Sequence, residues 1–221
     1  MRIGRFLKAA ADIVFPQHLK CHACGREAVV NDYGICSECE QKLKYVPMLP
    51  AIKGVDELKC GMLYTEPARM ALVSFKFNGA IYKKEFLAHF MCVPENWSAD
   101  CIVPVPLSAN RLKERGYNQS ELLAEEVSKK SGIPLRCDLL SRVRETEKQS
   151  LMTREERAKN LKKAFLASDN CRGLGIILID DIKTTGATLE ECAKELKKHG
   201  ADRVYALTAC CALEEKTESG R

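Results

Sequence analysis

GIILIDDIKTTGAT, at residues 175–188, is the stretch that decides the fold of this 221-residue chain. Its first five residues are apolar and rich in isoleucine, which predicts a buried parallel strand. Asp180 and Asp181 follow, and we expect the strand to end at them. A small, hydroxyl-rich turn over residues 183–188 then leads into an amphipathic helix that Gly200 closes. The stretch therefore predicts a strand, a tight turn and a helix N-terminus in immediate succession.

This succession can bind a phosphorylated sugar. The first N–H groups of a helix lack internal partners, and the helix dipole favours an anion beside them. Gly186 lets a phosphate approach the backbone closely, and three neighbouring threonines add hydroxyl donors. The two aspartates would repel a phosphate, but they could accept hydrogen bonds from vicinal sugar hydroxyls. An ordinary strand–turn–helix with an aspartate pair and a threonine cap is the alternative.

Length and composition fit one α/β domain with a small appendage. The hydrophobic content of 46% and charged content of 29% are ordinary for a soluble globular protein. No apolar run approaches the roughly 20 residues that span a bilayer. We interpret the N-terminal stretch before Pro16 as a short amphipathic helix, because Asp12 interrupts the apolar part that a signal sequence needs.

The net charge of +5 is unevenly distributed. Residues 107–165 carry 14 lysines and arginines against 9 acids, so the net positive charge of this segment equals that of the whole chain. The patch is modest and would suit a polyphosphate ligand, single-stranded nucleic acid, or both.

Four of the twelve cysteines form two CxxC pairs, Cys21 with Cys24 and Cys36 with Cys39. Each pair can offer two thiolates to one ion, so the set predicts a closed, structural zinc site with four sulfur ligands. Two unrelated thiol pairs or a redox CxxC are the alternatives. Most other cysteines lie in apolar contexts, which fits buried thiols in a reducing cytoplasm.

A second buried strand is predicted at residues 101–107, where Pro104 and Pro106 end its hydrogen bonding. A loop over residues 107–117 follows, and Asn118 with Glu121 resembles a capping box that opens a helix running to Gly132. The loop leaves the carboxyl end of a strand, where open α/β sheets bind ligands, so its cations are candidate anion contacts. A solvated charged surface is the alternative.

A further strand is predicted over residues 135–143, followed by a polar segment and a helix from Thr153. Cations in this region, Arg142 and Arg154 included, could close over an anionic ligand as a lid, or form a solvated surface. Lys76 is interpreted as an exposed helix lysine rather than an anion contact. We assign no catalytic residue. The candidate contacts for pyrophosphate or another anion are Leu107, Ser108, Arg111, Arg115, Arg144, Lys148 and Arg157.

Strands and helices alternate from residue 101 onward, which predicts a parallel sheet flanked by helices. We expect residues 1–50 to form an N-terminal helix and the metal-binding module, residues 51–213 to form the α/β domain, and residues 214–221 to form a flexible tail.

The run at residues 175–188 resembles the phosphoribosyl-pyrophosphate signature of type I phosphoribosyltransferases. That resemblance implies that Asp180 and Asp181 hold the 2- and 3-hydroxyls of ribose, with Mg²⁺ accompanying the ligand. The 5-phosphate would be wrapped by Thr184, Thr185, Gly186, Ala187 and Thr188.

The order of motifs along the chain is more specific still. Two CxxC pairs precede VPVPL, RGYNQSELLA, RETEKQSLM, TREERAKNL and LIDDIKTTGATL. This order resembles the ComF family, which includes ComFC and GntX-like proteins, although Tyr117 stands where the family pattern RGFNQ has phenylalanine. The resemblance implies a type I phosphoribosyltransferase fold preceded by a zinc-ribbon-like module.

In function, the ComF resemblance implies a role in DNA uptake and natural transformation. Proteins of this kind are thought to handle incoming single-stranded DNA in the cytoplasm, beside a membrane channel and a helicase-like partner. Four readings stay open. The chain transfers phosphoribosyl groups to an unidentified acceptor in DNA uptake; it is a phosphoribosyltransferase of nucleotide salvage; it binds single-stranded DNA and keeps the site as a sensor or relic; or it docks a competence partner.

Overall fold

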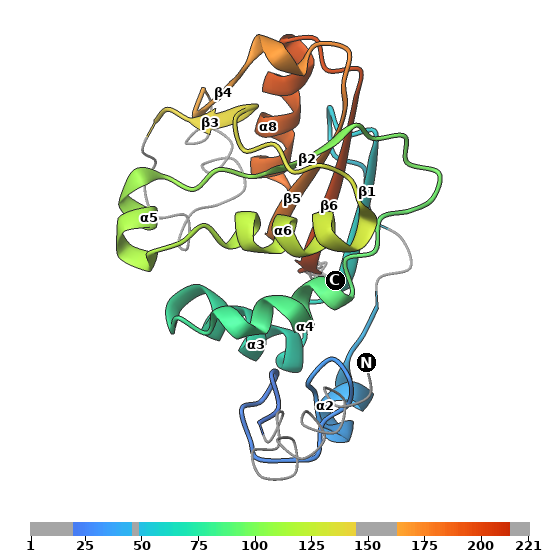
Figure 1. Ribbon diagram of the computed structural model, residues 1–221, viewed down its shortest axis with the longest axis vertical. Helices are drawn as coiled ribbons and strands as arrows, with labels where there is room; N and C mark the ends of the chain where they lie inside the picture. Colours follow the sequence, from blue (N-terminus) through green and yellow to red (C-terminus); the bar gives the residue numbers. More distant parts are fainter. Residues whose placement is uncertain (1–19, 46–48, 145–162, 213–221) are drawn as a thin grey trace, which may run out of the picture.

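The computed structural model describes residues 20–45, 49–144 and 163–212 (Figure 1). Its centre is a four-stranded sheet in the order β1-β6-β5-β2, with every neighbouring pair parallel. The strands are β1 (Glu57–Leu63), β2 (Cys101–Pro104), β5 (Gly175–Lys183) and β6 (Arg203–Cys211). The predicted parallel sheet flanked by helices is therefore confirmed.

Helices cover both faces of this sheet (Figure 1). One face, with Ile177 and Ile179, packs in a core shared with α3 (Glu66–Phe77), α4 (Lys84–His89) and α6 (Gln119–Ser131). The other face, with Ile176 and Leu178, packs against α8 (Ala187–Lys198). Burial on both faces explains why the central strands are continuous apolar runs rather than alternating ones.

Smaller elements complete the domain. The helix α5 (Ala109–Arg115) precedes α6, and the 3₁₀ turns η1 (Ile81–Lys83) and η3 (Asp169–Cys171) precede α4 and β5. The strands β3 (Leu140–Arg142) and β4 (Phe165–Ala167) form an antiparallel pair that lies beside α8 (Figure 1).

The strand β5 does not end at the aspartates, as the sequence led us to expect. It continues to Lys183 because β6 pairs with it throughout: Asp180 lies opposite Thr208 and Lys183 opposite Cys211. On its other side, β2 ends at Pro104, opposite Ile179. Among the described strands, the part of β5 that carries the acids therefore pairs with β6 alone.

Two other expectations were wrong in detail. The loop expected over residues 107–117 contains helix α5, which Ser108 caps and which ends at Gly116 with a φ of 81°. Only Leu140–Arg142 of the strand expected over residues 135–143 is extended and paired. Before it, Arg136 and Asp138 turn to solvent and bond each other at 2.7 Å.

The cysteine-bearing module packs against the side of the domain that carries α3 and α4 (Figure 1). It contains α2 (Ser37–Lys42) and two isolated bridges, and its buried residues share the core of α3 and α4. Tyr33 stacks on His89 with ring centroids 4.2 Å apart. Leu63 N donates to Lys44 O at 2.7 Å. The proposed domain boundary near residue 50 stays a prediction, as does the amphipathic helix at the N-terminus, which lies outside the described residues.

Across the described ranges, none of the helices combines the length and apolar character that crossing a membrane requires.

Candidate functional site

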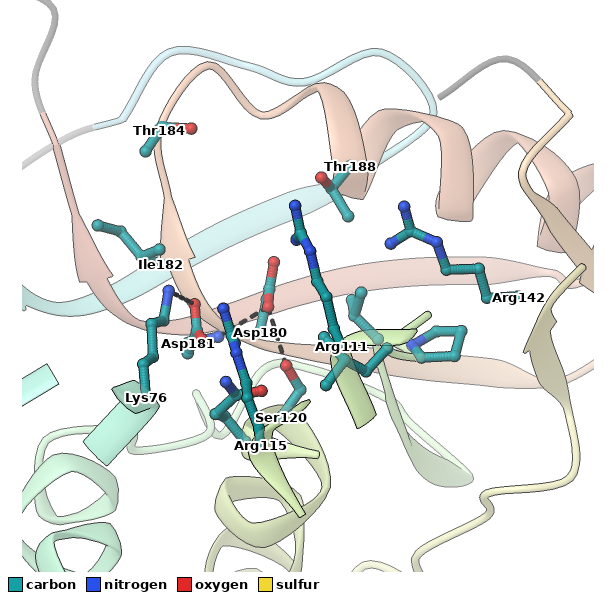
Figure 2. Close-up of a pocket in the computed structure, with 14 residues that line it drawn as sticks. Lys76, Arg111, Arg115, Ser120, Arg142, Asp180, Asp181, Ile182, Thr184 and Thr188 are labelled. Carbon is teal, nitrogen blue, oxygen red and sulfur yellow. Dashed lines mark hydrogen bonds and ion pairs between the residues drawn. The ribbon is translucent and has the colours of Figure 1, made fainter. Parts of the chain in front are cut away.

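A polar pocket of about 240 Å³ opens at the carboxyl end of the parallel sheet (Figure 2). This is the edge at which open α/β sheets bind ligands, because the loops after β2 and β5 diverge there. The pocket is lined by Lys76, Val105, Pro106, Leu107, Arg111, Arg115, Gln119, Ser120, Arg142, Asp180, Asp181, Ile182, Thr184 and Thr188. Four of these side chains are cations and two are carboxylates.

The aspartates are held from two different helices (Figure 2). Asp181, only 6% exposed, pairs with Lys76 Nζ of α3 at 2.7 Å through its Oδ1. Asp180 Oδ1 accepts hydrogen bonds from Ser120 Oγ of α6 and from the backbone N of Asp181, both at 2.9 Å. Each acid has one oxygen in these contacts, so its second oxygen can accept from a ligand.

Lys76 is not the solvent-exposed helix lysine that the sequence suggested. Its side chain is 17% exposed, and its amine reaches into the pocket to Asp181 (Figure 2). Because α3 packs by its apolar face against the sheet, the C-terminal turn that carries Lys76 lies beside the end of β5.

The carboxyl group of Asp180 is a weaker acid than an ordinary aspartate. Burial raises its pKa to about 7, and the neighbouring charge of Asp181 adds to the increase, while Lys76 and the bond from Ser120 oppose it. Asp180 therefore loses its proton near neutral pH, where a change in neighbouring charge alters its protonation.

This acidity predicts the pH dependence of stability. Folding raises the pKa of Asp180 from 3.8 to about 7, so the folded protein holds an extra proton between those values. The free energy of unfolding should then fall as pH rises from about 4 to about 7, and level off above that. In Asp180→Asn this contribution is missing. We expect its Tm to exceed that of the wild type by a margin that widens to several degrees by about pH 8. Thermal melts across this range test it, and a margin that stays constant with pH would contradict it.

The turn after β5 forms a second, small recess of about 20 Å³ that adjoins the pocket. It is lined by Thr184, Thr185, Gly186, Ala187 and Thr188, among others. Helix α8 begins at Ala187, so its N-terminus lies at this recess, and the N–H of Ala187 donates to Thr185 Oγ1 at 3.4 Å. Gly186 has a φ of 84°, and a Cβ there would lie 2.8 Å from Ile52 Cδ1. The positive φ favours glycine at this turn, whereas the contact with the end of the Ile52 side chain could be relieved by a small shift of that side chain.

The cations of the pocket come from three elements. Arg111 and Arg115 project from α5 and Arg142 from β3 (Figure 2). The Arg115 guanidinium lies 4.8 Å from the centre of the Phe77 ring, and burial lowers its pKa. This concentration of positive charge around a 240 Å³ space suits a polyanion.

The other predicted anion contacts differ in placement. Leu107 lines the pocket, whereas Ser108 is buried and accepts a hydrogen bond from Arg111 N as the cap of α5. Arg144 is exposed and is not among the lining residues. Lys148, Arg154 and Arg157 lie outside the described residues, so the lid stays a prediction.

Two buried donors in the pocket have no partner within the described residues: Gln119 Nε2 and Arg115 Nε. Gln119 is only 1% exposed. Buried donors are nearly always bonded in native proteins, so orphaned donors at a pocket wall indicate a ligand with acceptor atoms. We did not single out Gln119 or Ser120 from the sequence. The signal was their position directly after the Asn118 cap, which places them in the first turn of a helix that begins near the sheet edge.

The four cysteine sulfurs of the N-terminal module lie within 4.8 Å of one another. Cys21, Cys36 and Cys39 are buried, and Cys36 N donates to Cys21 Sγ at 3.4 Å. A tetrahedral site with Zn–S bonds of about 2.3 Å requires sulfurs roughly 3.8 Å apart, which this cluster can reach with small adjustments. The cluster therefore fits a metal ion, and four thiolates leave it no open position.

Comparison with known proteins gives the following matches. Residues 118–219 match the family model of the phosphoribosyl transferase domain. Competence protein ComFC of Bacillus subtilis is 33% identical over 190 residues, covering 81% of this chain and 72% of that protein. Competence protein F of Haemophilus influenzae is 28% identical, covering 83% and 86%. DNA utilization protein YhgH of Salmonella typhi is 28% identical, covering 87% and 97%.

Solved structures give weaker likenesses. The allosteric regulatory enzyme of purine biosynthesis is 19% identical with a TM-score of 0.38, over 63% of this chain and 26% of that one. The purine phosphoribosyltransferase of Pyrococcus horikoshii is 18% identical with a TM-score of 0.33, over 62% and 71%.

Proposed function

The chain belongs to the ComF family, that of the competence protein ComFC, and on this premise we propose that its pocket binds phosphoribosyl pyrophosphate with Mg²⁺. The observation that carries the proposal is the pocket itself. Two acids, a threonine-lined turn, four cations and two orphaned donors converge at the carboxyl edge of one sheet.

Each part of the ligand has a matching part of the site. The recess at Thr184–Thr188 offers hydroxyls and the N-terminus of helix α8 to the 5-phosphate. Asp180 and Asp181 accept hydrogen bonds from the ribose hydroxyls. Leu107 and Arg111 border the space for the diphosphate, where the remaining cations offset its charge. Mg²⁺, when bound, would supply further positive charge to the diphosphate oxygens.

If the bound donor reacts, the bond between ribose C1 and the diphosphate oxygen breaks, and an acceptor atom forms a new bond to C1. Diphosphate leaves with the electron pair. The chain's own contribution is to hold the sugar in place and to neutralise the leaving group through Arg111, Arg115 and Lys76. We name no acceptor. A ligand site without turnover is the second reading, and a turnover assay alongside binding distinguishes the two.

For the cellular role, we propose that the chain acts in the use of incoming DNA. The support is in the relatives' names, which describe competence proteins and DNA utilization proteins. The basic segment at residues 107–165 supports contact with single-stranded DNA, and such binding should weaken steeply with salt. We place the protein in the cytoplasm, at the inner face of the membrane where a helicase-like partner would act. The reducing conditions of the cytoplasm fit twelve cysteines that form no disulfide. Deletion of the gene in a competent host, followed by transformation assays, tests the role.

For the cysteine cluster, we propose a structural zinc ion held by Cys21, Cys24, Cys36 and Cys39. The support is the sulfur geometry and the small size of the module, which has little core of its own.

The ligand proposal is tested by calorimetric titration of the whole protein with phosphoribosyl pyrophosphate in the presence of Mg²⁺. Ribose 5-phosphate should bind more weakly at the same site, because it lacks the diphosphate that the cations face. No heat, and no rise in Tm with the donor and Mg²⁺, would remove the proposal.

A sharper prediction concerns Gln119. In Gln119→Leu the orphaned buried amide is gone, so the ligand-free protein should be as stable as the wild type or more stable. Binding of phosphoribosyl pyrophosphate should weaken about 10- to 100-fold, because a hydrogen bond to a charged ligand contributes about 1.5–3 kcal/mol.

Melting curves and titrations measure the two effects of Gln119→Leu separately. Gln41→Leu, an exposed site on α2, is the matched control and should change neither. Unchanged affinity in Gln119→Leu would mean that the orphaned amide faces no ligand atom.

A further inference from the structure

A second cavity, of about 540 Å³, lies between the cysteine module and helix α3, which are neighbours in Figure 1. Cys24 and Gly25 of the module form one part of its wall, and residues of α3 and of the chain up to the end of η1 form the rest. None of its lining residues belongs to the pocket at the sheet edge. It is therefore a separate space, and its volume lies within the range of about 300–1,000 Å³ that small-molecule sites occupy.

The wall of this cavity carries positive charge. Arg69 of α3 and Lys83 of η1 both line it, and among the described residues no carboxylate does so. Neither cation forms an ion pair with a described carboxylate, whereas neighbouring Lys84 lies 3.1 Å from Glu126. Lys83 is only 3% exposed, so bulk solvent screens its charge little. Two cations of this kind in one cavity favour an anionic ligand.

The remaining wall suits a flat apolar group. Tyr82 lines the cavity and is 56% exposed, although His22 packs against its ring with centroids 5.3 Å apart in an edge-to-face arrangement. Met70 and Val73 add apolar surface from α3, and Val73 is itself exposed. An exposed aromatic ring beside cations is the usual platform on which proteins stack a nucleobase.

We propose that this cavity is a second ligand site, which binds a nucleoside phosphate with its phosphate at Arg69 and Lys83 and its base on Tyr82. Such a ligand joins an anion to a planar ring, whereas inorganic phosphate or a nucleoside alone would use only one part of the wall. The proposal depends neither on the phosphoribosyl pyrophosphate site nor on the metal proposed above.

Two sources supply this chemistry: a free mononucleotide, and one unit of a single nucleic-acid strand. A free nucleotide would fill the cavity alone. A strand would continue beyond it, and the cavity would then add to the contacts that we propose between single-stranded DNA and the basic segment. The experiment distinguishes the two sources.

The whole protein is titrated with dAMP, with deoxyadenosine and inorganic phosphate as the two halves of that ligand, and with a fluorescent oligodeoxyadenylate of about ten nucleotides. Calorimetry follows the small ligands and fluorescence anisotropy follows the oligonucleotide. We expect dAMP to bind at least about 10-fold more tightly than either half, because each half lacks one set of contacts. Binding of dAMP assigns a free nucleotide as the source, and binding of the oligonucleotide without dAMP assigns a strand.

Variants of the wall show whether the ligand occupies this cavity. Lys83→Met, Arg69→Met and Tyr82→Ala should each weaken nucleotide binding about 10-fold or more, through loss of a charge-assisted hydrogen bond or of the stacking surface. Their affinity for phosphoribosyl pyrophosphate should equal that of the wild type. Lys84→Met and Tyr45→Ala are the matched controls, because neither residue lines the cavity, and both should bind nucleotide normally.

Gln119→Leu is the reverse control, since Gln119 lines the pocket at the sheet edge and not this cavity. It should bind nucleotide as the wild type does. If the protein does not bind phosphoribosyl pyrophosphate at all, this control still shows which of the two spaces holds the nucleotide.

The proposal is overturned if neither dAMP nor the oligonucleotide binds, or if the three cavity variants bind them as tightly as the wild type. Binding of inorganic phosphate as tight as that of dAMP, or loss of nucleotide binding in Gln119→Leu instead, would overturn it too. If Lys83→Met does not fold, Arg69→Met and Tyr82→Ala decide the question in the same way, because both side chains are exposed and their loss leaves the core intact.

Discussion

Replacing Asp180 and Asp181 together with asparagine should abolish the rise in Tm that phosphoribosyl pyrophosphate and Mg²⁺ give the wild type. Each carboxylate that accepts a hydrogen bond from a sugar hydroxyl contributes about 1.5–3 kcal/mol as a charged acceptor. Loss of both charges should weaken binding about 100-fold or more. The variant should still fold, because asparagine keeps the shape and removes the mutual repulsion that contributes to the raised pKa of Asp180.

The control for this double variant is Asp202→Asn. Asp202 is exposed and directly precedes β6, at the amino end of the strand and away from the pocket, so its replacement should leave ligand binding unchanged. Calorimetric titration of both variants, with melting curves to verify folding, measures the effect. A double variant that binds the donor as tightly as the wild type would show that the aspartates do not hold the sugar.

The sequence predicted the part of the candidate pocket whose residues are neighbours in the chain. The strand, the acids, the threonine turn and the helix start follow one another within 175–188, and each has a distinct chemical pattern. The same holds for the metal cluster, since ligand spacing within a short segment determines which sulfurs can meet.

Partners brought together by packing were not predictable in this way. Ser120 and Asp180 are 60 residues apart, and no sequence pattern in either segment predicts that they meet. Lys76 fits the polar face of an amphipathic helix as well as any surface lysine, because helical periodicity gives a face but not the neighbour it meets. Helix α5 was missed because its charged residues resemble those of a loop, while the cap at Ser108 and the stop at Gly116 determine its limits.

The two halves of the molecule should therefore be separable by mutation. Among the residues that the structure describes, none from the cysteine module lines the pocket at the sheet edge, and none of the pocket residues contributes to the metal cluster. Loss of the metal should lower the stability of the protein, and it should weaken ligand binding only to the extent that the protein unfolds.

Cys36→Ser tests this separation and carries the second large expected effect. Loss of one of four thiolates should leave the purified protein with less than one zinc per chain, because serine does not replace a thiolate ligand for this ion. Structural zinc contributes many kcal/mol to the folding of small modules, so we expect the Tm to fall by about 10 °C or more. Hydrogen exchange should increase over residues 20–44, while the titration with phosphoribosyl pyrophosphate should still give wild-type affinity in the protein that remains folded.

Cys92→Ser is the matched control, since Cys92 is exposed and lies outside the cluster. It should keep its zinc, its Tm and its ligand affinity. A Cys36→Ser protein with a full equivalent of zinc and an unchanged Tm would show that the four sulfurs do not act as one metal site. A loss of ligand affinity in well-folded Cys36→Ser would instead mean that the module positions α3, and with it Lys76, for the ligand.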